Sequence, residues 1–210
     1  MPAATIIALL GAECTGKTTL AQAVAADLQR TGVDAVVVPE ALREFCAHHG
    51  RTPCADEQAA LAQRQTDAVA AAAKAHAVVL ADTTALMTAV YSDLYFDDPG
   101  LYASAWPAHR AAHLTLLAAP DLPWVADGLQ RDGLARRAAV DERLRTVLQA
   151  QGQDFAVIVG EGEARTQAAL RAVWRCLHPP REAPGTPRWR WVCAHCGDGG
   201  CEAALLAQSR

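Results

Sequence analysis

One segment constrains this chain more than any other: residues 11–18 read GAECTGKT and match the pattern GxxxxGK[ST]. The segment directly follows an apolar run, Thr5 to Leu10, and opens a stretch rich in Ala, Leu and Gln that favours a helix. Glycines at these positions let consecutive backbone N–H groups point at a phosphate, and the start of the helix adds a partial positive charge. The segment therefore predicts a phosphate-binding loop. The alternative is an ordinary glycine turn between a strand and a helix.

Two side chains of this loop carry its predicted chemistry. We expect Lys17 to reach the β- and γ-phosphates of ATP and the Thr18 hydroxyl to bind Mg²⁺. Lys17 is one of only two lysines among 19 Lys and Arg residues, and it stands where a compact point charge is used. The residues predicted to bind the nucleotide are Gly11, Glu13, Cys14, Thr15, Gly16, Lys17, Thr18, Thr19 and Arg43.

Short apolar runs alternate with helical stretches along the first 177 residues. The predicted strands are Thr5 to Leu10, Ala35 to Val38, Ala77 to Ala81, His113 to Ala118 and Phe155 to Val159. The predicted helices are Lys17 to Thr31, Glu40 to His49, Asp56 to His76, Thr84 to Tyr95, Ala138 to Gln151 and Glu163 to Leu177. Strands that are apolar throughout are typical of parallel sheets buried on both sides. The pattern predicts an α/β fold of the P-loop NTPase class, a doubly wound five-stranded parallel sheet with helices on both faces.

Length and composition limit the domain organisation. The 210 residues, 51% of them hydrophobic, are enough for one α/β domain, which we expect over residues 1–178. Four prolines in the ten residues from 178 predict a linker over residues 179–192, followed by a cysteine-containing tail over residues 193–210. A net charge of −4 argues against nonspecific binding to nucleic acid or an anionic membrane, and no run of 18 apolar residues is present. We expect a cytoplasmic protein.

Two carboxylates follow predicted strands at the edge that would carry the phosphate loop. Glu40 comes after the second strand and Asp82 after the third. Either is a candidate for the base that accepts a proton from the attacking hydroxyl, and Asp82 is a candidate Mg²⁺ ligand together with Thr18. The alternative for both is a role at the start of a helix, as a cap or beside the helix dipole. Arg43, one turn beyond Glu40, would pair with it or with a phosphate.

The segment after the fourth predicted strand, PDLPWVADGLQRDGLARRAAVDER, is polar and contains glycines. It would close over a triphosphate and bring arginines to the transferring phosphoryl group, or it would be a solvated surface loop. Its candidate catalytic residues are Arg131 and Arg136, with Arg137 beside them. Between the third and fourth strands, bulky and acidic residues are available to bind an aromatic base and a ribose: Tyr91, Tyr95, Asp97, Asp98 and Trp106.

With these motifs in place, residues 4 to 177 resemble the ribosylnicotinamide kinase family, the P-loop kinase domain that some bacteria fuse to a nicotinamide-mononucleotide adenylyltransferase in a bifunctional NAD regulator. The resemblance rests on LLGAECTGKTTLAQAVA, VVPEALREF, LADTTALMTAVYSDLYF, LLAAPDLPWVADGLQR and IVGEGEARTQAAL. It implies transfer of the γ-phosphoryl group of ATP to the 5′-hydroxyl of nicotinamide riboside, with Arg131 and Arg136 in the lid and the loop after the fifth strand beside the adenine. This chain has Cys14-Thr15 where the family usually has two serines, and because the adenylyltransferase domain with its histidine motif is not found in these 210 residues, adenylylation is not expected.

The resemblance leaves the phosphoryl acceptor open, because small P-loop kinases for other nucleosides share this scaffold. The partners expected are ATP and a small nucleoside-like substrate, with no nucleic acid and no membrane. One alternative is a kinase for another nucleoside or deoxynucleoside. The other is a regulatory switch that binds ATP and a macromolecular partner without phosphorylating a metabolite.

The tail has a CxxC pair, Cys193 and Cys196, with Cys201 five residues further on. Two thiolates from such a turn suit tetrahedral Zn²⁺. Candidates for the fourth ligand are Cys176, His178, His195 and a thiol from a partner chain. A redox-active thiol cluster and a reduced tail that docks through Trp189 and Trp191 are the alternatives to zinc.

Overall fold

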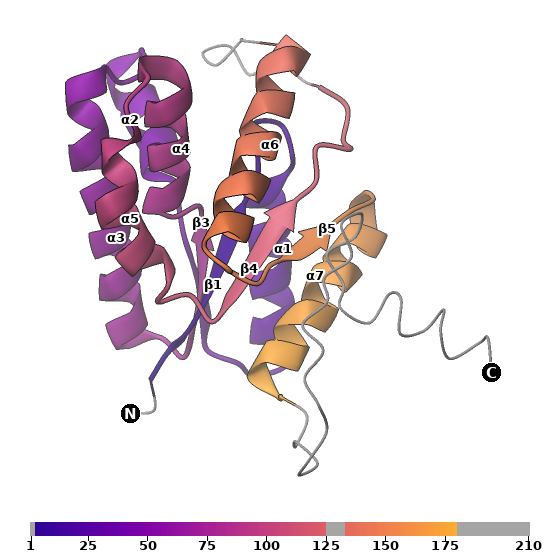
Figure 1. Ribbon diagram of the computed structural model, residues 1–210. Coiled ribbons are helices and arrows are strands. Elements are labelled where there is room, and N and C mark those ends of the chain that lie inside the picture. The colour runs from indigo at the N-terminus through magenta and orange to yellow at the C-terminus, as the bar shows by residue number, and fades with distance from the viewer. Residues whose placement is uncertain (1–2, 125–132, 180–210) are drawn as a thin grey trace.

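The computed structural model describes residues 3–124 and 133–179 of the chain, shown in Figure 1. Its strands are β1 (Thr5–Leu10), β2 (Ala35–Val38), β3 (Val78–Asp82), β4 (Leu114–Ala118) and β5 (Ala156–Ile158). Its helices are α1 (Lys17–Arg30), α2 (Ala41–His49), α3 (Gln58–Ala75), α4 (Ala85–Phe96), α5 (Tyr102–His109), α6 (Gly133–Ala150) and α7 (Gly162–Leu177), with short 3₁₀ turns at Ala55–Glu57 and Pro99–Leu101.

The five strands form one parallel sheet in the order β2-β3-β1-β4-β5. The register aligns the carboxyl ends of the strands, since Leu9 pairs with Asp82 and Leu10 pairs with Leu117. The loops that follow β1, β3 and β4 therefore lie side by side at one edge of the sheet. The predicted fold class, an α/β P-loop fold with a doubly wound five-stranded sheet, is confirmed.

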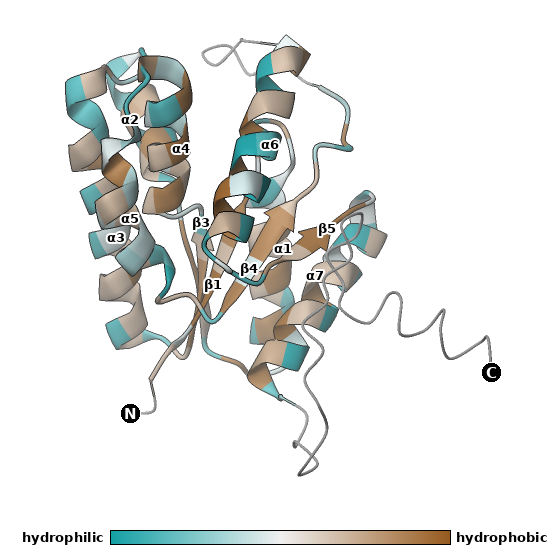
Figure 2. Cartoon of the chain, in the orientation of Figure 1, coloured by the Kyte–Doolittle hydropathy of each residue, from teal (hydrophilic) through white to brown (hydrophobic). Residues whose placement is uncertain are grey.

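Helices cover both faces of the sheet, because successive side chains of a strand point to opposite sides. Ile7 and Leu9 of β1 join the core that packs against α1 and α7, whereas Leu10 joins the core that packs against α4, α5 and α6. In Figure 1, α6 lies in front of the sheet and α1 behind it. Figure 2 shows hydrophobic strands at the centre and hydrophilic residues spread over the outer helices. None of the described helices is long and apolar enough to cross a membrane.

Two helical segments differ from the sequence predictions. Helix α5 was not expected, because the Asp97-Asp98-Pro99 turn and Pro107 argue against a helix there; Pro107 stands inside it. Helix α6 begins at Gly133, five residues before the predicted start at Ala138, because the intervening Leu, Ala and Arg residues are good helix formers. Arg136 and Arg137 therefore lie on the first two turns of a helix rather than in a loop.

The predicted linker from residue 180 onward and the predicted tail lie outside the described residues. Helix α7 ends at Leu177, and Pro179 is the last described residue. The domain boundary at residue 178 stays a prediction.

Candidate functional site

The loop between β1 and α1 has the backbone conformation that a phosphate-binding loop needs. Gly11 has a φ of 148°, and a Cβ atom there would lie 2.7 Å from the Ala118 carbonyl oxygen, so only glycine fits. Gly16, immediately before α1, has a φ of 73°. Cys14 adopts the left-handed region without being glycine, with a φ of 54°. The chain curls tightly over the end of β1 before α1 begins.

Lys17 and Thr15 both turn back onto this loop. The Lys17 ammonium, on a residue only 7% exposed, donates a hydrogen bond to the Ala12 carbonyl oxygen at 2.8 Å. The Thr15 hydroxyl donates to the same oxygen at 2.9 Å. The one positive charge of the loop is therefore held at its centre, at the start of α1.

Thr18 and Asp82 meet across the edge of the sheet. The Thr18 hydroxyl donates to Asp82 Oδ2 at 2.5 Å, and the other carboxylate oxygen, Oδ1, is buried with no hydrogen-bond partner in the described part of the chain. Asp82 caps no helix, since the N-cap of α4 is Thr84. A hydroxyl and a carboxylate are hard oxygen ligands of the kind that Mg²⁺ prefers. This pair therefore fits the predicted metal ligands.

Glu40 is buried at the N-cap of α2, and its side chain caps no backbone N–H group of that helix. Burial raises the pKa of its carboxyl group; Lys17 opposes that shift, and Asp82 adds to it. The predicted pairing with Arg43 is present but long, with 3.8 Å between Arg43 Nε and Glu40 Oε2. The electrostatic coupling indicates that Glu40, Asp82 and Lys17 share one environment.

Glu13 of the loop and Tyr91 of α4 join the same acidic environment. Burial raises the pKa of Tyr91 well above its ordinary value, and the charges of Glu13 and Glu40 raise it further. Glu13 is itself buried, and its Oε2 atom has no hydrogen-bond partner among the described residues. Sequence reasoning counted Glu13 as a loop residue without foreseeing that it adds a carboxylate beside Glu40.

Arg136 lies against α4. Its guanidinium stacks 4.7 Å from the centre of the Tyr95 ring and donates to the Leu94 carbonyl oxygen at 3.3 Å. The Tyr95 ring in turn meets Tyr91 edge to face at 5.9 Å. Arg136 therefore belongs to the aromatic side of the site. Arg131, the other predicted lid arginine, lies outside the described residues.

Two further arginines, Arg137 and Arg165, bind the phosphate loop from outside it. Arg137 donates to the Leu122 carbonyl oxygen at 2.8 Å and to the Cys14 carbonyl oxygen at 3.4 Å. Arg165, on α7, donates to the Thr15 carbonyl oxygen at 2.9 Å. Both side chains are almost fully buried. Sequence reasoning missed Arg165, whose only signal was its place just after a glycine-containing loop at the same sheet edge.

His109 lies fully buried behind the site. Its two ring nitrogens lie 3.0 Å from the Thr84 hydroxyl and 3.2 Å from the Thr115 hydroxyl. Thr84 starts α4 two residues after Asp82, and Thr83 between them has a φ of 74°, which is strained for a β-branched residue. His109 thus holds the Thr84 side chain at the N-cap of α4, two residues after Asp82.

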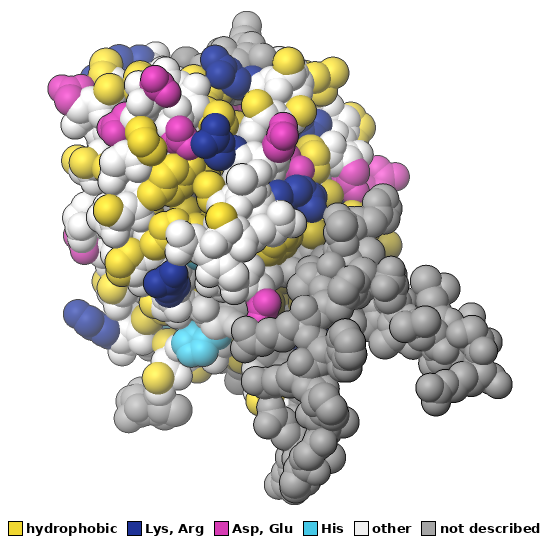
Figure 3. All heavy atoms as spheres, in the orientation of Figure 1, with side chains coloured by type: hydrophobic (Ala, Val, Ile, Leu, Met, Phe, Trp, Pro, Cys, Tyr) yellow, Lys and Arg dark blue, Asp and Glu magenta, His cyan; other side chains and the backbone are white. Residues whose placement is uncertain are grey.

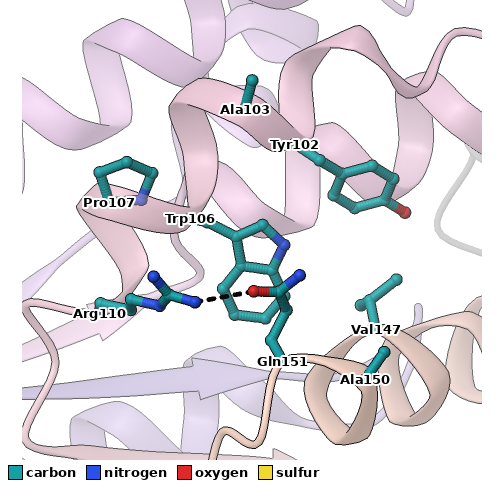
Figure 4. A pocket seen from close by; sticks show the side chains of 8 residues that line it. All are labelled: Tyr102, Ala103, Trp106, Pro107, Arg110, Val147, Ala150 and Gln151. Carbon is teal, nitrogen blue, oxygen red and sulfur yellow. Dashed lines mark hydrogen bonds between the residues drawn. The ribbon is translucent and has the colours of Figure 1, made fainter.

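Trp106 is not part of this site. It lines a groove of ≈ 460 Å³ between α5 and the far end of α6, together with Arg110 and Gln151, whose side chains hydrogen bond at 2.7 Å (Figure 4). Val147 of this groove is ten residues beyond Arg137, about 15 Å along the helix. Figure 3 shows hydrophobic side chains gathered between α5 and α6 on this face. The expectation that Trp106 would bind an acceptor base at the phosphate loop is not supported.

The predicted acidic residues Asp97 and Asp98 have local roles. Asp97 is the C-cap of α4, and the Asp98 side chain accepts a hydrogen bond from the Gly100 N–H group. Of the cysteine site, Cys193, Cys196, Cys201 and His195 lie outside the described residues. Cys176 is partly buried, and the His178 ring stacks on Trp174 at 5.3 Å.

Comparison with known proteins gives a family and a fold. Residues 6–165 match the family described as AAA domain. Among solved structures, the chain resembles two described as NadR protein, one in complex with NR and one in complex with NAD and AMP-PNP. Their TM-scores are 0.69 and 0.64 and their sequence identities 22% and 20%, each over 87% of this chain. This chain spans 54% and 52% of those two proteins. No curated protein matches.

Proposed function

The chain belongs to the AAA domain family, whose P-loop fold binds nucleotides, and on that premise we propose that it is a kinase that transfers the γ-phosphoryl group of ATP to the 5′-hydroxyl of nicotinamide riboside. One observation carries the proposal. Lys17, the Thr18–Asp82 pair and the buried Glu40 meet at the carboxyl edge of one sheet, directly over the phosphate loop. Phosphoryl transfer needs this set: a cation for the phosphates, ligands for a metal ion and a carboxylate for the acceptor hydroxyl.

Each residue has a distinct part in the proposed reaction. Lys17 would leave the Ala12 carbonyl oxygen for the β- and γ-phosphates, which outcompete a neutral carbonyl for the ammonium. Thr18 and Asp82 would hold Mg²⁺, which bridges phosphate oxygens and offsets the charge that develops on them during transfer. Glu40 would accept the proton of the attacking hydroxyl, and its raised pKa makes it a better proton acceptor than an ordinary carboxylate.

The charges near the loop support a cationic acceptor. Glu13, Glu40 and Asp82 place three carboxyl groups near one ammonium, and two of these side chains have oxygens without a hydrogen-bond partner in the described structure. Nicotinamide riboside carries a positive pyridinium ring, whereas the common nucleosides are neutral. The faces of Tyr91 and Tyr95 would suit such a ring through cation–π contact. One matched NadR structure is described as a complex with NR, which agrees with this acceptor.

The test is ADP release from ATP and Mg²⁺ with a panel of acceptors. Nicotinamide riboside should stimulate release more than its neutral dihydro form, adenosine or deoxynucleosides. Lys17→Ala should abolish the stimulation, whereas Lys74→Ala, which removes the chain's other lysine from the last turn of α3, should not. If another nucleoside stimulates ADP release more strongly, that nucleoside becomes the proposed acceptor in place of nicotinamide riboside. If only a macromolecular partner stimulates ADP release, the chain is a regulatory switch and the kinase proposal is wrong.

A further inference from the structure

Arg165 uses every terminal N–H group of its guanidinium on a different acceptor. Besides Thr15 O, its Nη2 atom donates to Ala119 O at 3.1 Å, and its Nη1 atom donates to Gly160 O at 2.7 Å and to Asp121 Oδ1 at 2.8 Å. These acceptors belong to the phosphate loop, to the segment after β4 and to the loop after β5. One side chain therefore joins three segments that are far apart in the sequence.

Asp121 completes the connection. Its second oxygen, Oδ2, accepts a hydrogen bond from the Gly160 N–H group at 2.6 Å. Two hydrogen bonds therefore hold the loop after β5 at Gly160: Arg165 binds the Gly160 carbonyl oxygen, and Asp121 binds the Gly160 N–H group. The Arg165 side chain is only 5% exposed, so its hydrogen bonds are largely shielded from competing water, whereas the Asp121 side chain is 35% exposed and faces solvent on its outer side.

This placement runs against local preference. Arg165 stands on the first turn of α7, where the helix dipole disfavours a cation, and a buried charge adds little stability over apolar packing. Its Nε atom is buried without a partner in the described structure. A residue that breaks local rules in this way points to a functional constraint.

The strand order shows which part of a ligand these loops would meet. The candidate base Glu40 follows β2 and the candidate metal ligand Asp82 ends β3, both on one side of β1, and the Arg165 connection lies on the other side, at β4 and β5. A nucleotide with its phosphates on the loop and its acceptor near Glu40 would extend its base toward β5. This step rests on the proposed function.

We propose that Arg165, fixed by Asp121, is a positioning residue that couples the loop at the nucleotide base to the phosphate loop, so that base and phosphates are bound as one unit. In this arrangement the adenosine part of ATP adds affinity only while the two loops keep their spacing. Arg165 contacts the loops and not the reacting atoms.

The test compares two ligands on the full chain by isothermal titration with Mg²⁺: ATP, which spans both loops, and inorganic tripolyphosphate, which reaches only the phosphate loop. Arg165→Met should reduce the preference for ATP over tripolyphosphate about tenfold. Arg165→Lys should not restore it, because one ammonium with three N–H groups cannot serve four acceptors on three segments. Arg171→Met removes an exposed arginine from the same helix and should leave the preference unchanged.

Asp121→Asn keeps the size of the side chain and removes its charge, and it should also reduce the preference for ATP over tripolyphosphate. If Arg165→Met does not fold, this variant tests the coupling in its place. Equal losses for both ligands, or an unchanged preference in folded variants, would overturn the coupling. Binding is measured here without an acceptor. If the wild-type chain prefers ATP over tripolyphosphate as expected but does not phosphorylate nicotinamide riboside, only the proposed function is contradicted, and the coupling through Arg165 stands.

Discussion

Replacing His109 by glutamine should flatten the pH dependence of stability on the acid side of neutrality. Burial lowers the pKa of His109 from 6.5 to about 4. The groups that face its ring are the hydroxyls of Thr84 and Thr115 and the edge of Trp106, none of them charged. The neutral ring is therefore favoured in the folded protein, because none of the described groups that face it carries a negative charge that would stabilise the protonated ring.

The magnitude follows from the two pKa values. Because the folded value lies below the unfolded one, the unfolded chain binds the proton first, and acid removes stability. The contribution is complete above about pH 6.5 and is lost as the pH falls toward 4, a total of about 3 kcal/mol at 1.36 kcal/mol per pKa unit. Between pH 7.5 and pH 5, the loss assigned to His109 is about 2 kcal/mol.

The assay is urea unfolding at pH 7.5 and pH 5 for the wild-type chain and His109→Gln. The variant will start less stable, since it changes a buried contact, but its free energy of unfolding should fall by about 2 kcal/mol less over this interval. All other ionisable groups are the same in the two proteins, so their contributions cancel in the comparison. Parallel pH profiles would refute the reasoning, because they would mean that His109 is protonated equally easily in both states.

Three further predictions concern the site and the tail. Lys17→Ala should lower phosphoryl transfer by about three orders of magnitude in a protein with an unchanged melting temperature, and near-normal transfer would remove the phosphate-loop assignment. Glu40→Gln should lower turnover far more than nucleotide affinity, whereas Asp82→Asn should shift the Mg²⁺ concentration that half-saturates the reaction; reversed outcomes would exchange the two roles. Removal of residues 179–210 should leave a folded, nucleotide-binding core. Elemental analysis of the full chain separates the two interpretations of the tail: zinc that is lost on Cys193→Ser supports a metal site, and a metal-free chain supports docking.

The sequence was sufficient for elements whose signals are local. The apolar runs of β1 and β2 coincide with the observed strands, and residues 11–18 adopt the loop that their glycines predict. Helix α5 was not predicted, because the segment is short and contains Pro107, which lacks the N–H group that a helix interior uses; its packing against α4 stabilises the helix nonetheless.

The candidate site was predictable only where its residues follow strands directly. Glu40 and Asp82 could be placed because the carboxyl ends of parallel strands meet at one edge. Arg165 could not, because its partner Thr15 is 150 residues away in the sequence and no periodicity reports such a contact. Likewise, nothing local indicates that Arg136 turns toward Tyr95 rather than toward the loop.

The strand order also divides the charges of the sheet edge into two sides. In the described structure, the carboxylates of Glu40 and Asp82 lie at the ends of β2 and β3 without a close cationic partner of the Arg165 kind, whereas beside β4 and β5 the Asp121 carboxylate is paired with the buried guanidinium of Arg165, and Arg137 is buried nearby. Under the proposed function, the anionic nucleotide and the cationic acceptor would therefore approach an edge whose acidic groups Glu40 and Asp82 lie on the β2 and β3 side. Charge alone would then direct the cationic acceptor toward Glu40 and Asp82, so that the proposed donor and acceptor would be told apart before their shapes are tested.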